Sequence, residues 1–127
     1  DIYIPYKNSI NSETGKIVRN PKRPIFNFAS KYASKKKNDF ISFKSFKKDW
    51  IVSDSLVTVF FSQLDNDSIT VITDSVLIDI EYIKNTIKSE IAGSVWGKDE
   101  AANIRLLFDN QVVEALKHFN EADAFLD

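Results

Sequence analysis

The chain has few side chains that could perform chemistry, and their spacing points to no catalytic site. His118 is the only histidine, so a two-histidine metal site or a histidine-based triad with several possible bases is excluded within this sequence. A lone histidine near a predicted helix end is typical of a surface residue that compensates the helix dipole. The glycines at 15, 93 and 97 do not form the pattern of a phosphate-binding loop. We therefore predict no catalytic, cofactor-binding or metal-binding residue, and no cofactor.

The run "DNDS" at residues 65–68 is similar to the start of a calcium-binding loop. Such a loop needs a glycine at its sixth position and a glutamate at its twelfth, which here is Val76. The run is therefore predicted to be an ordinary turn. Asp99 and Glu100 form an acidic pair, but adjacent acids are typical of the first turn of a helix, so we assign them no catalytic role.

Charge is distributed unevenly, although the formal net charge is −1. Residues 49–127 contain five bases and fifteen acids, a net charge of −10, whereas residues 16–48 have a net charge of +10, with eleven bases and one acid, Asp39. Either an anionic partner or contact between two oppositely charged parts would explain this distribution. No groove-reading or base-stacking motif accompanies the bases, so nucleic acid is not favoured as a partner. The bases of this segment are Lys16, Arg19, Lys22, Arg23, Lys31, Lys35, Lys36, Lys37, Lys44, Lys47 and Lys48.

Aromatic residues gather in the same part of the chain. They could form a hydrophobic core or a platform on which bases stack, and their helical spacing favours the core. The cluster consists of Phe26, Phe28, Tyr32, Phe40, Phe43, Phe46, Trp50, Phe60 and Phe61.

Length and composition indicate a single globular domain. The 127 residues are 43% hydrophobic, which is enough to build one core. Without cysteine the chain has no disulfide and no thiolate metal site. No apolar run approaches the roughly 18 residues needed to span a bilayer, and no signal-peptide pattern occurs in the sequence. Because the sequence contains no methionine and begins with Asp1, we expect it to be a piece of a longer protein.

The spacing of apolar residues predicts an all-α fold of about six short helices in one compact domain. Apolar residues recur every three or four positions, as on one face of a helix. The irregular parts are a proline-containing lead-in over residues 1–24, in which "DIYIP" could form an edge strand, and a short extended segment at 69–73. The predicted helices cover residues 25–33, 43–50, 56–64, 76–95, 101–108 and 112–119.

Residues at the ends of these helices predict how they begin and stop. Ser53 or Asp54 is suited to cap the helix over 56–64, and Asp109 or Asn110 to cap the last one. Gly97 is predicted to end the longest helix with a positive φ, while Trp96 fills the corner before the next helix begins.

The order of these motifs resembles a known family. "DIYIP", "IFNFASKYASKKK", "FKKDWIVSDSLVTVFFSQL", "IEYIKNTIKSEIAGSVWG" and "FDNQVVEALKHFNEA" follow one another. Their succession is similar to the region after the catalytic core in exported carboxyl-terminal-processing (tail-specific) serine peptidases of Bacteroidetes-like bacteria. The resemblance spans nearly the whole chain. It departs from the family after Trp96-Gly97, where a pair of tyrosines is replaced by Ala101 and Ala102.

The resemblance implies a non-catalytic role for this chain. In the family, the catalytic serine and its lysine base lie in the preceding core, so the parent would be a Ser/Lys endopeptidase of the periplasm or cell envelope. Residues 1–24 would then link to that core, and residues 25–127 would form a helical accessory domain. The implied partners are the peptidase core and PDZ module of the same chain and the parent's protein substrates. The alternative is a free-standing binding module that uses residues 16–48 on nucleic acid or an anionic envelope surface.

Overall fold

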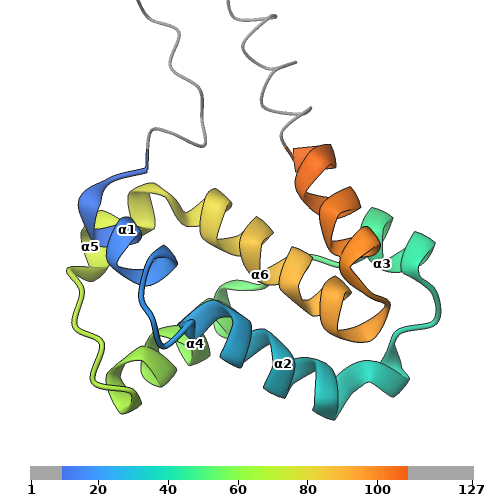
Figure 1. Ribbon diagram of the computed structural model, residues 1–127, viewed down its shortest axis with the longest axis horizontal. Coiled ribbons are helices and arrows are strands. Elements are labelled where there is room, and N and C mark those ends of the chain that lie inside the picture. The colour runs from blue at the N-terminus through green and yellow to red at the C-terminus, as the bar shows by residue number, and fades with distance from the viewer. Residues whose placement is uncertain (1–9, 109–127) are drawn as a thin grey trace, which may run out of the picture.

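The structure, a computed structural model, describes residues 10–108, and these form the predicted all-α fold (Figure 1). No strand occurs within this range, and none of its helices is long and apolar enough to cross a membrane. In chain order the elements are α1 (Ser12–Val18), α2 (Pro24–Lys36), the 3-10 helix η2 (Lys37–Asp39), α3 (Phe43–Asp49), α4 (Asp54–Asn66), α5 (Thr73–Ile78), α6 (Ile80–Val95) and a helical stretch at 98–108.

The hydrophobic core lies along α6. α2 packs along this helix, and α4 packs against α2 (Figure 1). One face of α6 is completely buried, with Ile83, Ile87 and Ile91 at 0% exposure. The rings of Phe28 and Phe60 meet edge to face, with 5.2 Å between their centroids, where α2 meets α4. Since short helices are marginal in isolation, this shared apolar burial is what stabilises them.

The helices predicted at 25–33, 43–50 and 56–64 are confirmed as α2, α3 and α4. Ser53 is the N-cap of α4, because its hydroxyl accepts a hydrogen bond from the Leu56 amide at 3.1 Å. This bond satisfies one of the N–H groups that the first turn leaves free.

The end of the chain is only partly described. The helix predicted at 101–108 is confirmed and begins at residue 98, with Ala101 and Ile104 buried. The helix predicted at 112–119, its cap at Asp109 or Asn110, and the strand considered for residues 1–5 lie outside the described residues.

The prediction of an irregular lead-in over residues 1–24 is wrong where α1 forms. Asn11 is the N-cap of α1, and its side-chain oxygen accepts hydrogen bonds from the amides of Glu13 and Thr14 at 3.0 and 3.1 Å. Ile17, at 1% exposure, joins the core. A polar, glycine-containing run has low helix propensity, but this cap and the tertiary contacts of α1 overcome it.

The single long helix predicted over 76–95 is also wrong, because α5 and α6 are separate helices that meet at Asp79. Asp79 has φ −102° and ψ 27°, outside helical geometry. Its buried Oδ2 accepts hydrogen bonds from the Asn11 amide at 2.9 Å and the Thr14 hydroxyl at 2.7 Å. These donors are 68 and 65 residues away in sequence, so a tertiary contact sets the break and the local apolar spacing does not reveal it.

The extended segment predicted at 69–73 is confirmed as non-helical chain only as far as Ile72, because α5 begins at Thr73. Ile72 has extended geometry, with φ −83° and ψ 104°. Ile69 is buried, and its amide donates to the Leu64 carbonyl at 2.9 Å, so this segment closes α4 rather than pairing with a strand.

Gly97 ends α6 with the predicted positive φ, measured at +122°. Its amide donates to the Gly93 carbonyl at 3.0 Å, and its own carbonyl accepts from the Ala101 amide at 3.2 Å. The residue therefore belongs to the hydrogen bonding of both helices, and its backbone conformation allows the chain to turn between them.

Replacement of Gly97 by valine is expected to lower the free energy of unfolding by about 1 to 3 kcal/mol, because a β-branched residue is strained at positive φ. An added Cβ would meet only the Glu100 carboxylate, at 3.5 Å, so the cost arises from the backbone and not from a clash. Urea unfolding measures it. Ala102→Val, at an exposed helical position, is the control, and an equal loss in the two variants would contradict the assignment.

Candidate functional site

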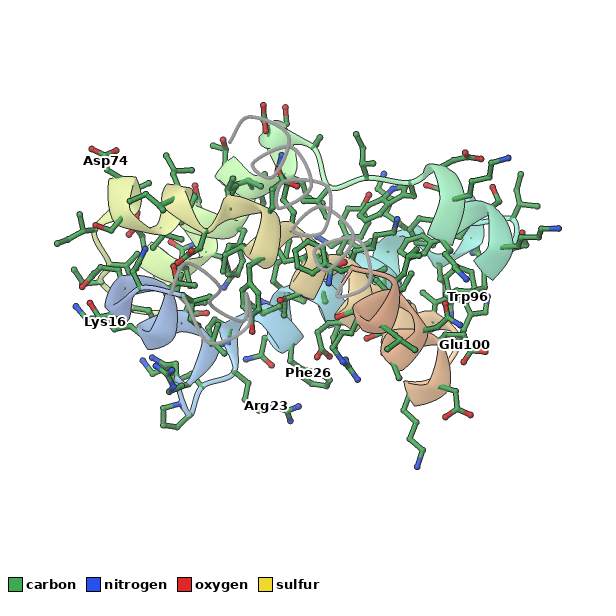
Figure 2. All side chains as sticks on the ribbon, turned by 90° about the horizontal axis from the view of Figure 1, so that it is seen from above. Lys16, Arg23, Phe26, Asp74, Trp96 and Glu100 are labelled. Atoms are coloured by element: carbon green, nitrogen blue, oxygen red, sulfur yellow. The ribbon has the colours of Figure 1, made fainter. Side chains whose placement is uncertain are left out.

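Trp96 lies at the corner after α6 (Figure 2). It packs against the ring of Phe40, directly after η2, and against two rings of α3. The centroid of its ring is 6.0 Å from Phe40, 5.5 Å from Phe43 and 5.2 Å from Phe46. Trp96 itself is only partly buried. The indole thus joins the end of α6 to α3, as a residue that fills the corner would.

The remaining members of the aromatic cluster pack mainly on one another. Phe46 stacks on Trp50 at 4.9 Å, and Tyr32 lies 5.9 Å from Trp50. Phe26 is the most exposed member, at 37%, and its ring is covered by the Arg23 guanidinium at 4.1 Å (Figure 2). These rings belong to the hydrophobic core or to its margin. They therefore do not form a series of exposed rings on which the bases of a nucleic acid could stack.

The other residues considered from the sequence form no site in the described part of the chain. Asp65 lies in the last turn of α4, and Asp67 is the C-cap, whose amide donates to the carbonyls of that turn. No group of acidic or histidine side chains within residues 10–108 is arranged to hold a metal ion. His118 lies outside the described residues.

The bases of segment 16–48 remain on the surface. All of them are exposed except Lys47, which is half-buried. Two of the ion pairs in the described range involve these bases, Lys16 with Glu13 and Lys36 with Asp39, and both acids precede residue 49. Within residues 10–108, the basic segment is therefore not neutralised by ion pairs with the acidic half.

Lys88 is a half-buried amine that sequence reasoning missed. Its Nζ donates to the Lys47 carbonyl at 2.9 Å and lies 5.5 Å from the centroid of the Phe46 ring. Burial lowers the pKa of this amine, against a smaller opposing effect of Asp49. The contacts tie α6 to α3, and only the tertiary fold brings them together.

α5 is held in place by α1. The Glu13 carboxylate accepts a hydrogen bond from the Ile72 amide at 2.8 Å and pairs with Lys16 at 2.8 Å. The Asn11 side chain donates to the Ser75 carbonyl at 2.7 Å. Figure 1 shows α1 and α5 side by side at one end of the molecule, where the described chain begins.

Three apolar residues in or next to α5 are exposed. Ile78 is 79% exposed, Ile72 61% and Leu77 44%, whereas Val76 points into the core at 0%. We call Ile72, Leu77 and Ile78 the α5 patch. Single exposed apolar residues are common, but three of them in and directly before a short helix that polar contacts fix in place are suited to protein contact.

The contact between α1 and α5 is expected to weaken in acid. The hydrogen bond from Lys16 and that from the Ile72 amide lower the pKa of Glu13 below its ordinary value. Because the folded state holds this carboxylate ionised, its contribution is present above the unfolded pKa and is lost as pH falls through the folded one. Urea unfolding from neutral pH to about pH 3 should show a steeper loss for the parent than for Glu13→Gln, and parallel curves would contradict it.

Comparison with known proteins gives a family but no activity. Residues 18–97 match the model of a family of unknown function, DUF8443. No curated protein and no solved structure matches the chain. The matched region runs from the end of α1 to Gly97, so it includes α2, α3, α4, α5 and α6, whereas the core residues Ile17 and Ile104 lie outside it. Since this is more than half of the 127 residues, the chain belongs to the DUF8443 family.

Proposed function

We propose that this chain is a non-catalytic helical accessory domain that packs against a peptidase core. It would scaffold that core or shape substrate access to it, as the C-terminal domain does in the carboxyl-terminal-processing serine peptidases that its motifs resemble. The proposal includes a periplasmic or cell-envelope location, because those peptidases are exported. The observation that carries it is the α5 patch, which lies beside α1 at the point where the described chain begins.

The position of the α5 patch supports a core of the same chain as its occupant. A core that precedes residue 10 in the chain would be joined to it next to α1. Glu13 and Asn11 hold α5 beside α1, so the core would lie near the α5 patch. Covering Ile72, Leu77 and Ile78 would remove apolar area from water at about 25 cal/mol per Å². Interfaces between domains of one chain are formed in this way and are commonly modest in area.

The first test is the gene itself. We expect a peptidase core with a catalytic serine and lysine to be encoded in frame before residue 1, and the isolated chain to turn over no fluorogenic peptide. An in-frame start codon close to Asp1, with no such core between, would refute the proposal. Turnover by the purified chain that survives contaminant controls would favour an independent enzyme instead.

The second test places the interface. In the full-length protein, Ile78→Asp is expected to loosen the packing of the domain on the core, seen as faster limited proteolysis between them and altered peptidase activity. The matched control is Ile41→Asp, at a 94% exposed position before α3 and away from α5. Equal behaviour of the two variants would show that the α5 patch is not the interface.

A second candidate function rests on the basic segment, whose bases are exposed, except the half-buried Lys47, and are not paired with the acidic half within residues 10–108. These exposed bases are suited to binding an anionic envelope surface. Each base near an anionic membrane contributes about 1 kcal/mol to the binding free energy. Sedimentation with vesicles of about 30% anionic lipid, lost in salt well above physiological strength, would support it. Equal sedimentation with neutral vesicles would contradict it.

A further inference from the structure

A groove separate from the α5 patch runs between α2, the end of α6 and the helix at 98–108. Its volume is about 700 Å³, which is within the range of clefts that hold small ligands, and it is open to solvent along one side. The groove does not include α5, so a ligand bound in it would add to the proposed function and would not depend on a preceding peptidase core.

The walls of the groove combine three kinds of side chain. Lys37, Lys98 and Arg105 supply positive charge, against a single acid, Glu90. Three serines, Ser30, Ser34 and Ser94, supply hydroxyl groups. The apolar lining residues are Phe26, Ala33, Val95 and Ala101.

The cations of the groove have no partner in the described part of the chain. Lys37, Lys98 and Arg105 are exposed, and no carboxylate of residues 10–108 pairs with any of them, Glu90 included. A groove with a charge excess of this sign attracts anionic groups. The Ser30 and Ser94 hydroxyls hydrogen-bond to each other at 3.5 Å between α2 and α6. Each hydroxyl keeps capacity for a further hydrogen bond to a ligand.

Gly93 and Ala101 make the groove shallow and apolar where α6 meets the helix at 98–108. A Cβ added to Gly93 would approach the Ala101 methyl to 3.2 Å, so α6 and the helix at 98–108 are already in close contact there. The exposed ring in the groove, Phe26, is covered by Arg23. A nucleic acid would need bare aromatic faces and a longer track of cations, whereas a peptide can place small apolar side chains in this groove and carboxylates on the rim.

We propose that this groove binds a peptide segment of a partner protein that carries both acidic and small apolar side chains. Its carboxylates pair with Lys37, Lys98 and Arg105, and its backbone hydrogen-bonds to the serine hydroxyls. Its apolar side chains contact Val95 and the part of Phe26 that Arg23 leaves exposed. Peptide recognition of this kind uses charge for selectivity and apolar contact for affinity.

The test uses a fluorescein-labelled twelve-residue peptide made of three Asp-Leu-Ala-Glu repeats, and fluorescence anisotropy. Binding is expected at low salt and is expected to be absent for the Asn-Leu-Ala-Gln counterpart, which has the same apolar residues and no charge. Lys98→Glu and Arg105→Glu should each weaken binding by about three- to tenfold. Ser94→Trp, which fills the groove without changing the net charge, should abolish it.

Two controls separate the groove from general attraction. Lys44→Glu makes the same change of charge on α3, outside the groove, and should bind as the parent does. A loss equal to that of Arg105→Glu would overturn the proposal, as would the absence of binding to the parent, or tighter binding of a single-stranded oligonucleotide with the same dependence on Arg105. Circular dichroism confirms that each variant is folded before its binding is read.

Discussion

Replacement of Trp96 by alanine is expected to lower the free energy of unfolding by about 3 kcal/mol, the lower end of the range for large aromatic deletions. The lower end applies because the indole is only partly buried. The centroid of its ring lies between 5.2 and 6.0 Å from those of Phe40, Phe43 and Phe46. These contacts join the end of α6 to the segment that contains η2 and α3. Against a total stability of about 5 to 15 kcal/mol for a domain of this kind, the loss is large.

The measurement for Trp96→Ala is urea unfolding, with Phe26→Ala as the control. Phe26 is also aromatic and partly exposed, but its ring contacts the Arg23 guanidinium and no other ring of the cluster within residues 10–108. Its removal should therefore cost clearly less. A midpoint for Trp96→Ala within error of the parent would mean that Trp96 is a recognition residue and that the corner is held by other contacts.

Replacement of Asp79 by alanine is expected to lower the free energy of unfolding by about 3 kcal/mol, because hydrogen bonds to a charged group contribute about 1.5 to 3 kcal/mol each and one of the two donors is buried. The Asn11 amide would lose its acceptor, and the buried Thr14 hydroxyl would keep only its longer bond to the Asn11 side-chain oxygen, at 3.4 Å. Asp79 also stands at the N-terminus of α6, where a negative charge is favourable. Asp79→Asn retains an acceptor and should cost less.

Asp74→Ala provides the matched control for Asp79→Ala. Asp74 is an exposed acid in the first turn of α5, so its removal tests the loss of helix-end charge without the loss of buried hydrogen bonds. A double-mutant cycle with Thr14→Val should give a coupling energy of about 1 kcal/mol or more. Equal effects of Asp74→Ala and Asp79→Ala, with no coupling to Thr14, would contradict the role given to Asp79.

The α5 patch and the groove make different demands on a partner. The patch offers apolar area next to the start of the described chain, whereas the groove offers free cations between α2 and the helix at 98–108. Ile78→Asp and Ser94→Trp change one surface each. The two proposals can therefore succeed or fail separately, and only the first requires a peptidase core.

The sequence by itself determined the features that arise within one turn or one helix. The apolar spacing of Phe28, Ala29 and Ala33 predicts the buried face of α2, since side chains three and four positions apart share a side. Ser53 is recognisable as a cap because its hydroxyl bonds an amide three residues on. Gly97 is recognisable as a stop because only glycine adopts its φ without strain.

Tertiary structure alone decided the features that depend on residues distant in sequence. α1 forms, and the helix over 76–95 breaks, because Asn11 and Thr14 meet the Asp79 carboxylate across 65 or more residues. The helix propensities of the neighbouring residues do not predict that contact. The groove likewise exists only because α2 and the helix at 98–108 lie on either side of α6, which places Lys37 and Arg105 around one hollow. Spacing along a chain predicts which side chains share a helix face, whereas packing between helices determines which faces meet.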